Sequence, residues 1–380
     1  MERLLLTNGR VVTPHRVIEP GTVVVEAGRI VEVVARTYPT GPLTWDVRGN
    51  FVLPGVINLH DDGYERALQP RQGVFLPAAL VFHHMEWALA ASGITSIYHA
   101  VSFDEGLFLR ERTIAQAERM VRDLLTFNQA DFAQLHHRIL YRCDLRSAGS
   151  LDSIINVIND PLAAAPSCYL SLNDHSPGQG QYAWRQAEQR LWDLKVQTER
   201  ARAEQLEQVA QLAKQSPSVI IASHDDDSAA TVDTLYELGV RVSEFPVNRE
   251  AAQRAKDLDL PVIVGAPNIV RGGSHTNNVS ALELIEARLA DILVADYAPS
   301  TLLHAVFVLV EQGVLSLVEA VRLITTNAAG VVGLEHETGS ILPGLSADLI
   351  VVEARSDPLL NMVQLMFVDG RVYHHQMGVQ

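Results

Sequence analysis

The sequence has few cysteines and a deficit of positive charge. Cys143 and Cys168 are its only cysteines among 380 residues, which excludes a disulfide framework and leaves two reduced, buried thiols as the expectation. Lysine and arginine number 30 against 45 acidic residues, giving a net charge of −15. The chain therefore lacks the basic field that non-specific binding to nucleic acid or to an anionic membrane surface requires, and neither partner is expected.

Long apolar runs are also missing. The N-terminal segment carries a short apolar run at residues 4–6 and does not have the layout of a signal peptide. No stretch approaches the roughly 20 consecutive apolar residues of a membrane-spanning helix. These absences predict a soluble cytoplasmic protein.

The composition supports a large folded core. Hydrophobic residues make up 47% of the chain, too many for a disordered polymer. A chain of this length fits one large α/β domain with a small satellite.

From residue 51 onward, apolar β-rich runs alternate with helical stretches. This rhythm predicts a parallel sheet covered by helices. Eight such units favour a closed (β/α)8 TIM-like barrel. A doubly wound open sheet is the alternative, but its glycine-rich fingerprint is missing. The expected strands span residues 51–58, 94–100, 138–145, 168–174, 218–224, 240–245, 261–266 and 291–296.

Both ends of the chain have β character. Residues 1–50 and 339–380 contain short apolar runs with Asn-Gly and Asp-Gly turns, and we predict that they pair into one small β-sandwich domain. Residues 51–338 then form the barrel. A long, charged, alanine-rich stretch at 183–215 is expected as a helical excursion or lid after the fourth strand.

Polar side chains gather where the predicted strands end, which is the catalytic face of a barrel. His60 and Asp62 point the same way because the strand period is two, so both can bind one divalent ion. An isolated histidine at a strand end is more often structural, but six such groups on one face indicate a metal site. Asp144 is the candidate bridge between two ions, and Asp296 is the candidate general base. The predicted metal ligands are His60, Asp62, Asp144, His175, His224 and Asp296.

A loop after the seventh strand is the second candidate region. Its glycines permit close approach of a ligand, and its arginine suits bidentate phosphate binding, although an ordinary glycine-containing loop is the alternative. The predicted substrate-binding residues are Asn268, Arg271, Gly272, Gly273, Ser274 and His275.

Other polar groups are ambiguous or carry no predicted role. The run Asp225–Asp227 either caps the next helix or supports a neighbouring ligand. Four further histidines are expected on the surface or on helices: His83, His84, His136 and His137.

Several segments together resemble a known family. VLPGVINLHDD and GSILPGLSADLIVV are similar to the amidohydrolase superfamily, whose chain ends build a β-sandwich beside a metal-binding barrel. HDDGYERALQPR, SLNDHSPGQ and GAPNIVRGGSH resemble one branch more closely, the diphosphatases that act on α-D-ribose 1-methylphosphonate 5-triphosphate in the carbon–phosphorus lyase pathway. The resemblance covers nearly the whole chain.

The resemblance implies a reaction and its cofactors. The expected enzyme hydrolyses a small phosphorylated sugar, the ribose 5-triphosphate, to the 5-phosphate and diphosphate with two divalent ions, Zn²⁺ or Mn²⁺. It implies metal roles for His60, Asp62, His175, His224 and Asp296. Asp144 stands where the family is expected to have a glutamate, whose side chain is longer. Of the metal roles carried over from the family, the bridging role of Asp144 is therefore the least direct.

Two other functions stay open at this point. The same metal pair could hydrolyse a C–N bond, as deacetylases and cyclic amidases do. A non-enzymatic component of a phosphonate-processing assembly is the other possibility, although such a protein has no need of six strand-end ligands. The sequence is compatible with a homo-oligomer but does not fix the oligomeric state.

Overall fold

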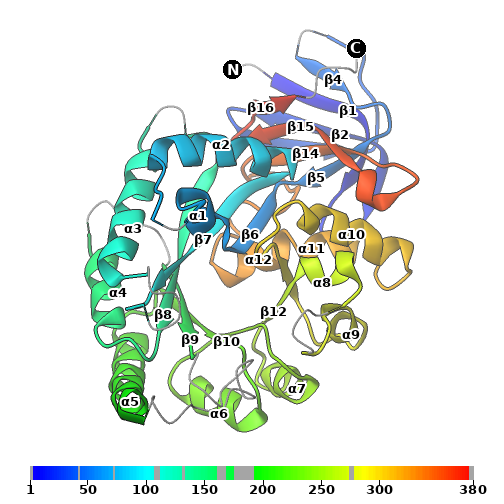
Figure 1. Ribbon diagram of the computed structural model, residues 1–380. Helices are drawn as coiled ribbons and strands as arrows, with labels where there is room; N and C mark the ends of the chain where they lie inside the picture. Colours follow the sequence, from blue (N-terminus) through cyan, green and yellow to red (C-terminus); the bar gives the residue numbers. More distant parts are fainter. Residues whose placement is uncertain are drawn as a thin grey trace.

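The computed structural model describes residues 3–41, 43–71, 73–106, 112–130, 133–160, 168–174, 192–273 and 278–375. Within these ranges the chain forms two eight-stranded sheets and a layer of helices. The first and last described segments of the chain lie in the sheet that stands beside the barrel (Figure 1).

One sheet is a parallel barrel, as predicted. Its strands follow the chain in order, and neighbours pair in parallel throughout. Hydrogen bonds from the Asp296 amide to the His60 carbonyl (3.0 Å) and from the Asp62 amide to the Asp296 carbonyl (2.8 Å) join the last strand to the first. The strands are β6 (Val56–Asp61), β7 (Ile94–Phe103), β8 (His136–Asp144), β9 (Cys168–Asn173), β10 (Val219–His224), β11 (Val242–Glu244), β12 (Val262–Gly265) and β13 (Ile292–Val294).

Helices cover the outside of this barrel (Figure 1). Several begin at a residue whose side chain accepts the N-terminal amides, such as Thr113, Ser228 and Asn248. The helices are α1 (Gly63–Leu68), α2 (Ala78–Ala91), α3 (Ile114–Asn128), α4 (Ser150–Ile158), α5 (Trp192–Gln215), α6 (Ala229–Glu237), α7 (Arg249–Asp257), α8 (Ala266–Arg271), α9 (Ala281–Glu286), α10 (Thr301–Glu311), α11 (Leu317–Arg322) and α12 (Thr326–Val331). None of the described helices is both long and apolar enough to span a bilayer.

The second sheet combines both ends of the chain and confirms the predicted terminal β domain. Its strands run in the order β16-β15-β14-β5-β1-β2-β3, with β4 beside β1. They are β1 (Arg3–Val12), β2 (Val17–Glu26), β3 (Arg29–Val34), β4 (Thr44–Asp46), β5 (Phe51–Pro54), β14 (Leu349–Glu353), β15 (Met362–Val368) and β16 (Arg371–His375), with a short 3-10 helix, η4 (Pro358–Leu360), between β14 and β15.

The strand predicted over 51–58 is wrong as a single element. Phe51–Pro54 is β5, which belongs to the terminal sheet, and the barrel strand β6 starts at Val56. Gly55 separates them, and a Cβ there would lie 2.3 Å from the Thr95 hydroxyl oxygen. The chain therefore changes sheets at Pro54–Gly55, a break that an uninterrupted apolar run concealed.

The stretch at 183–215 was expected as a solvated excursion or lid, and its described part differs from this expectation. Helix α5 contacts α4 and β10, and Val209 is fully buried in the apolar layer outside the barrel. Gln205 is buried as well, and its amide nitrogen donates to the carbonyls of Asp144, Leu145 and Ser147. The second half of α5 is thus a packed barrel helix. Residues 183–191 lie outside the described ranges.

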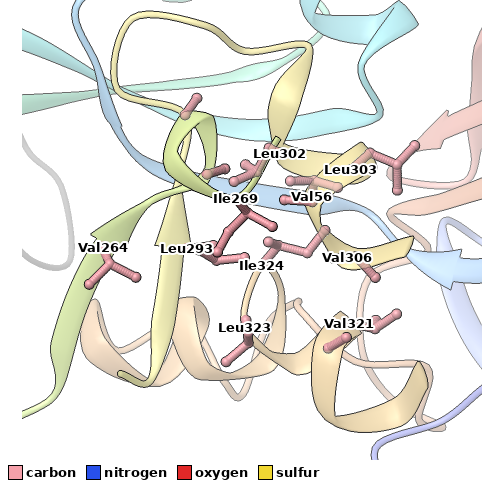
Figure 2. Close-up of a cluster of buried hydrophobic side chains, with 14 of the residues drawn as sticks. Val56, Val264, Ile269, Leu293, Leu302, Leu303, Val306, Val321, Leu323 and Ile324 are labelled. Carbon is pink, nitrogen blue, oxygen red and sulfur yellow. The ribbon is translucent and has the colours of Figure 1, made fainter. Parts of the chain in front are cut away.

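Apolar packing on both sides of the strands keeps their ends in place. Figure 2 shows side chains of β13 and helices α8, α10 and α11 converging in one cluster, with Leu293, Ile269 and Leu302 among them. These residues are 5% exposed or less. This close packing holds the ends of the strands rigidly, and with them the polar side chains that they carry.

Candidate metal centre

Three of the predicted ligands meet at the carboxyl ends of the strands. Donor atoms of His60, Asp62 and Asp296 all lie within 4.8 Å of one another. Nε2 of His60 is 3.4 Å from a carboxylate oxygen of Asp62. His224 lies beside them, with its ring centroid 5.7 Å from that of His60. Residues from β6, β10 and the chain after β13 thus form one cluster.

Unusual backbone conformations shape this cluster. Asp225 and Phe245 directly follow β10 and β11, Asp296 lies two residues after β13, and each has a positive φ of 54–59°. For phenylalanine this region is strained, and such strain gathers at functional sites. The turn at Phe245 places its ring 5.2 Å from the rings of both His60 and His224. The strand ends are therefore bent to aim side chains at one point.

Glu244 contacts both histidines through their Nδ1 atoms. Its carboxylate faces Nδ1 of His60 at 3.2 Å and Nδ1 of His224 at 3.3 Å. Tyr169 and Ser171 donate to the same buried carboxylate, at 3.2 and 2.8 Å. A carboxylate that accepts both Nδ1 protons leaves both Nε2 atoms as the positions at which a metal can bind.

Arg142 brings a buried positive charge into the cluster. Its guanidinium donates to Asp62 at 3.0 Å and to the side-chain oxygen of Asn173 at 2.7 and 3.0 Å. Burial alone would raise the pKa of Asp62, but Arg142 and His60 outweigh it, so that pKa lies well below its usual range. Asp62 is therefore an anion, ready to serve as a ligand.

The other ionisable groups respond to their neighbours. Burial disfavours a charged His60 ring, but Glu244 and Asp62 outweigh burial and raise the pKa of His60 to about 10. The pKa of Asp296 is raised above its ordinary value by burial and by the charge of Asp62. Metal binding at this cluster must accordingly displace a proton from His60.

The described residues fit a divalent transition metal. Two imidazoles with anchored Nδ1 atoms and two carboxylates are the donor set that Zn²⁺ and Mn²⁺ use. His60, Asp62 and Asp296 would hold an ion, with His224 beside them. A second ion would also use the predicted ligands Asp144 and His175.

The structure does not bring the predicted ligand Asp144 into the cluster. Asp144 at the end of β8 is held by Arg146, whose Nε lies 2.9 Å from one of its oxygens. No ligand group that includes Asp144 is found among the described residues. His175 lies outside the described ranges. The metal roles of Asp144 and His175 stay predictions.

The predicted substrate loop borders the cluster. Arg271 ends α8, and its guanidinium lies 3.4 Å from the hydroxyl of Tyr297, the neighbour of Asp296. The side-chain oxygen of Asn268 is buried and has no hydrogen-bond partner among the described residues, as an acceptor awaiting a ligand hydroxyl would.

The glycines of this loop end the helix. The amides of Gly272 and Gly273 donate to Ile269 and Asn268 carbonyls, and Gly272 has a φ of +78°. Among the described residues, no atom lies within 4 Å of the place where a Cβ of either glycine would be, so these residues leave room for a ligand. Their binding role stays a prediction, and Ser274 and His275 lie outside the described ranges.

Sequence reasoning missed Glu244 and Arg142. Glu244 was visible as a carboxylate at the end of the sixth strand, but nothing in the sequence says that it faces two histidines. Arg142 lies two residues from Leu140 and two from Asp144 along β8. This spacing places the three side chains on the same face of the strand, and it is the signal that assigns Arg142 to the inner face.

Known proteins are similar to this chain in sequence and in structure. The model of the amidohydrolase family matches residues 233–375. The alpha-D-ribose 1-methylphosphonate 5-triphosphate diphosphatase of Escherichia coli (strain K12) is 31% identical over 371 residues, which cover 93% of this chain and 96% of that protein.

Solved structures share the fold at lower identity. Dihydropyrimidinase from Brevibacillus agri has a TM-score of 0.68 at 12% identity, over 98% of this chain and 95% of that one. N-acetylglucosamine-6-phosphate deacetylase from Pasteurella multocida has a TM-score of 0.62 at 15% identity, over 98% and 100% of the two chains.

Proposed function

This chain belongs to the amidohydrolase family, and from that membership we propose that it hydrolyses α-D-ribose 1-methylphosphonate 5-triphosphate to the 5-phosphate and diphosphate. The observation that carries the proposal is the 31% identity to the Escherichia coli diphosphatase over nearly the full length of both chains. The proposed setting is phosphonate catabolism in the cytoplasm, with a small phosphorylated sugar as the substrate and a homo-oligomer as a further possibility.

The proposed cofactor is a pair of divalent ions, Zn²⁺ or Mn²⁺. His60, Asp62, His224 and Asp296 are the described residues that would hold them, together with the predicted ligands Asp144 and His175. When bound, such ions lower the pKa of water and offset the charge of the phosphates.

Asp296 is proposed as the general base. Burial and the nearby Asp62 charge raise its pKa, which makes its carboxylate a better proton acceptor than an exposed aspartate. It takes a proton from the attacking water as the water oxygen bonds to the α-phosphorus. The bond from that phosphorus to the bridging oxygen then breaks, and diphosphate leaves with the electron pair.

Cationic side chains would hold the phosphates. Arg142 points into the cluster, and Arg271 stands beside Tyr297 at its edge. Guanidinium groups bind phosphate oxygens in a bidentate manner. The buried acceptor of Asn268 is proposed to take a sugar hydroxyl.

Phosphorus NMR of the Mn²⁺- or Zn²⁺-loaded protein with the ribose triphosphate tests this reaction. The reaction in ¹⁸O-water is expected to release unlabelled diphosphate and to place the label in the sugar 5-phosphate. Label in the diphosphate would contradict attack at the α-phosphorus. Absence of turnover by folded, metal-loaded protein would overturn the proposed substrate.

Arg271→Ala separates a triphosphate from a neutral amide substrate. Loss of a charge-assisted contact is expected to raise KM for the triphosphate by about ten- to a hundredfold. The matched control is Arg288→Ala, an exposed arginine that pairs with Glu319. An unchanged KM in the Arg271 variant would remove that residue from the proposed phosphate site and favour C–N hydrolysis.

A further inference from the structure

Helix α2 presents an apolar outer surface to solvent. The helix runs along the outside of the barrel, in contact with α1, α3 and strands β15 and β16 of the terminal sheet (Figure 1). Large apolar side chains on its outward side and in the segment just before it are each 38–59% exposed. These side chains, called the α2 patch below, are Val74, Phe75, Leu76, Leu80 and Trp87.

The packing of α2 on the barrel does not use this patch. The helix buries a separate inner face, where Phe82 packs against Tyr64 and Phe127 with ring centroids 4.4 and 4.9 Å away. A helix that is apolar on both sides is ordinarily covered on both. The neighbouring helix α3 shows the usual pattern of a half-buried helix, because its exposed side carries ion pairs such as Arg122 with Glu118.

No acidic residue, lysine or arginine is exposed on this surface. Residues 73–103 contain one such residue, Glu86, and its side chain is fully buried. The carboxylate of Glu86 accepts the backbone amides of Gln134 and Leu135, at 2.8 and 2.9 Å, on the inner side of the helix. It also faces Nε2 of His137 at 3.1 Å. His137 was expected at the surface or on a helix, and the structure corrects this, because it is a buried residue of β8.

The spacing of side chains along α2 suits contact with a second copy of the helix. Leu80 and Trp87 are seven residues apart, which is two turns or roughly 10 Å along one side of a helix. His83 and His84, exposed on this helix as predicted, lie between them, and the ring of His83 packs edge-on against Trp87 with centroids 6.5 Å apart. A two-fold axis passing between the two histidines therefore places Leu80 of each copy opposite Trp87 of the other.

Area and charge both favour a second copy as the occupant of the patch. Its five side chains present on the order of 500 Å² to solvent, the size at which a single patch is commonly an interaction site. With the exposed Ala79, His83, His84 and Ala88 beside them, the surface approaches the roughly 800 Å² per partner of a stable dimer. Because each copy has a net charge of −15, contact through a face without carboxylates avoids the repulsion that an acidic face would bring.

A lipid surface is the competing occupant of an exposed apolar helix. Helices that lie in a membrane interface carry lysine and arginine beside their apolar face, and residues 73–103 contain neither. The net negative charge of the chain also opposes binding to an anionic bilayer. The composition around α2 therefore favours a protein partner.

We propose that the α2 patch is the interface of a homodimer in which the α2 helices of two copies pack antiparallel across a two-fold axis. Leu80 and Trp87 are the central contacts, and a large aromatic side chain at such a position commonly dominates the binding energy. The proposal rests on neither the metal site nor the reaction of the proposed function, so its failure leaves both unchanged.

Sedimentation equilibrium of the full-length protein between about 1 and 100 μM measures this association. The wild type is expected to dimerise with a dissociation constant in the micromolar range or below. Leu80→Glu puts a carboxylate into the contact in both copies, and we expect it to raise that constant by about a hundredfold or more. The matched control is Leu360→Glu on η4, which changes a leucine of nearly equal exposure (56% against 57%) and should leave the dimer intact.

A crosslink between two copies tests the predicted axis. His84→Cys places a thiol close to the axis, and a short bismaleimide is expected to join two copies of this variant. Leu360→Cys is the control that should stay uncrosslinked, and the wild type, with Cys143 and Cys168, gives the background.

Three results would count against the proposal. A wild type that stays monomeric at about 100 μM would overturn it. An oligomer that folded Leu80→Glu leaves unchanged, or copies that His84→Cys does not crosslink, would move the interface to another face. A monomer that binds phosphatidylcholine vesicles, and loses that binding in Leu80→Glu, would assign the α2 patch to a membrane instead.

Discussion

At the scale of single residues, the site depends on which atom of each histidine carries a proton. Glu244 accepts from Nδ1 of both His60 and His224, and this one carboxylate fixes two tautomers. Both rings are therefore oriented in advance with Nε2 directed away from Glu244, which lowers the cost of ordering them around an ion once His60 has lost its second proton.

Glu244→Gln tests this arrangement. Its amide oxygen can accept from one histidine, but its NH₂ group then faces the other and drives the proton of that ring to Nε2. We expect affinity for Zn²⁺ to fall by about ten- to a hundredfold in a chelator competition assay. Exposed Glu286→Gln on α9 is the control.

The pH dependence of binding gives a further check on the same variant. Because the pKa of His60 is about 10 and Glu244 contributes to raising it, binding to the wild type displaces a proton and strengthens as pH rises from 6 to 8. The slope should be shallower in Glu244→Gln. Equal slopes in the two proteins would contradict the assigned link between Glu244 and His60.

Sequence reasoning succeeded at this scale where geometry is local. The spacing of His60 and Asp62 predicted that both face one point, and their donor atoms do meet. The roles of Glu244 and Arg142 depend on contacts between strands far apart in sequence, and no local pattern encodes them.

At the scale of elements, apolar runs located the barrel strands but not the sheet to which each belongs. Residues 51–54 and 56–61 form one apolar run, yet β5 pairs with β14 and β6 pairs with β7. In α5, charge on the exposed face suggested a solvated excursion, although Gln205 and Val209 are buried against the barrel. The composition of a helix averages over its exposed and buried faces, so many charged residues do not show that the whole helix is exposed.

Gln205→Leu tests the packed position of α5. The change leaves three backbone carbonyls and the Leu151 amide without their side-chain partner. We expect the free energy of unfolding in urea to fall by about 3 kcal/mol. Gln208→Leu, three residues along at a more exposed position, should change it by about 0.5 kcal/mol or less. Equal effects would argue against α5 as part of the core.

At the scale of the whole molecule, a polar cluster ties the barrel to the terminal sheet. Nε2 of His136 on β8 lies 3.7 Å from Asp348 and 3.8 Å from Asp369. Burial acts against a charged His136, but Asp348 and Asp369 outweigh it and raise the pKa of His136. Burial likewise acts to raise the pKa of Asp348, but His136 outweighs it and lowers that pKa.

These shifts define the pH range in which the cluster stabilises the fold. The contribution of His136 is fully present below its unfolded pKa and disappears as pH rises through its folded pKa, whereas that of Asp348 disappears in acid. His136→Ala should therefore reduce the free energy of unfolding by about 1 kcal/mol at pH 5.5 and by less at pH 9. His336→Ala, an exposed histidine, is the control, and a loss independent of pH would contradict the ion pair.

The shared terminal sheet also governs when the molecule can fold during its synthesis. Val52 of β5 pairs with Val351 of β14, so a strand made before the barrel segment waits for a strand made after it. Until then β1 and β5 offer an open edge in the nascent chain, which chaperones must shield or other chains can pair with. The barrel is translated within that interval. The terminal sheet can therefore be completed only after the whole barrel segment has been made.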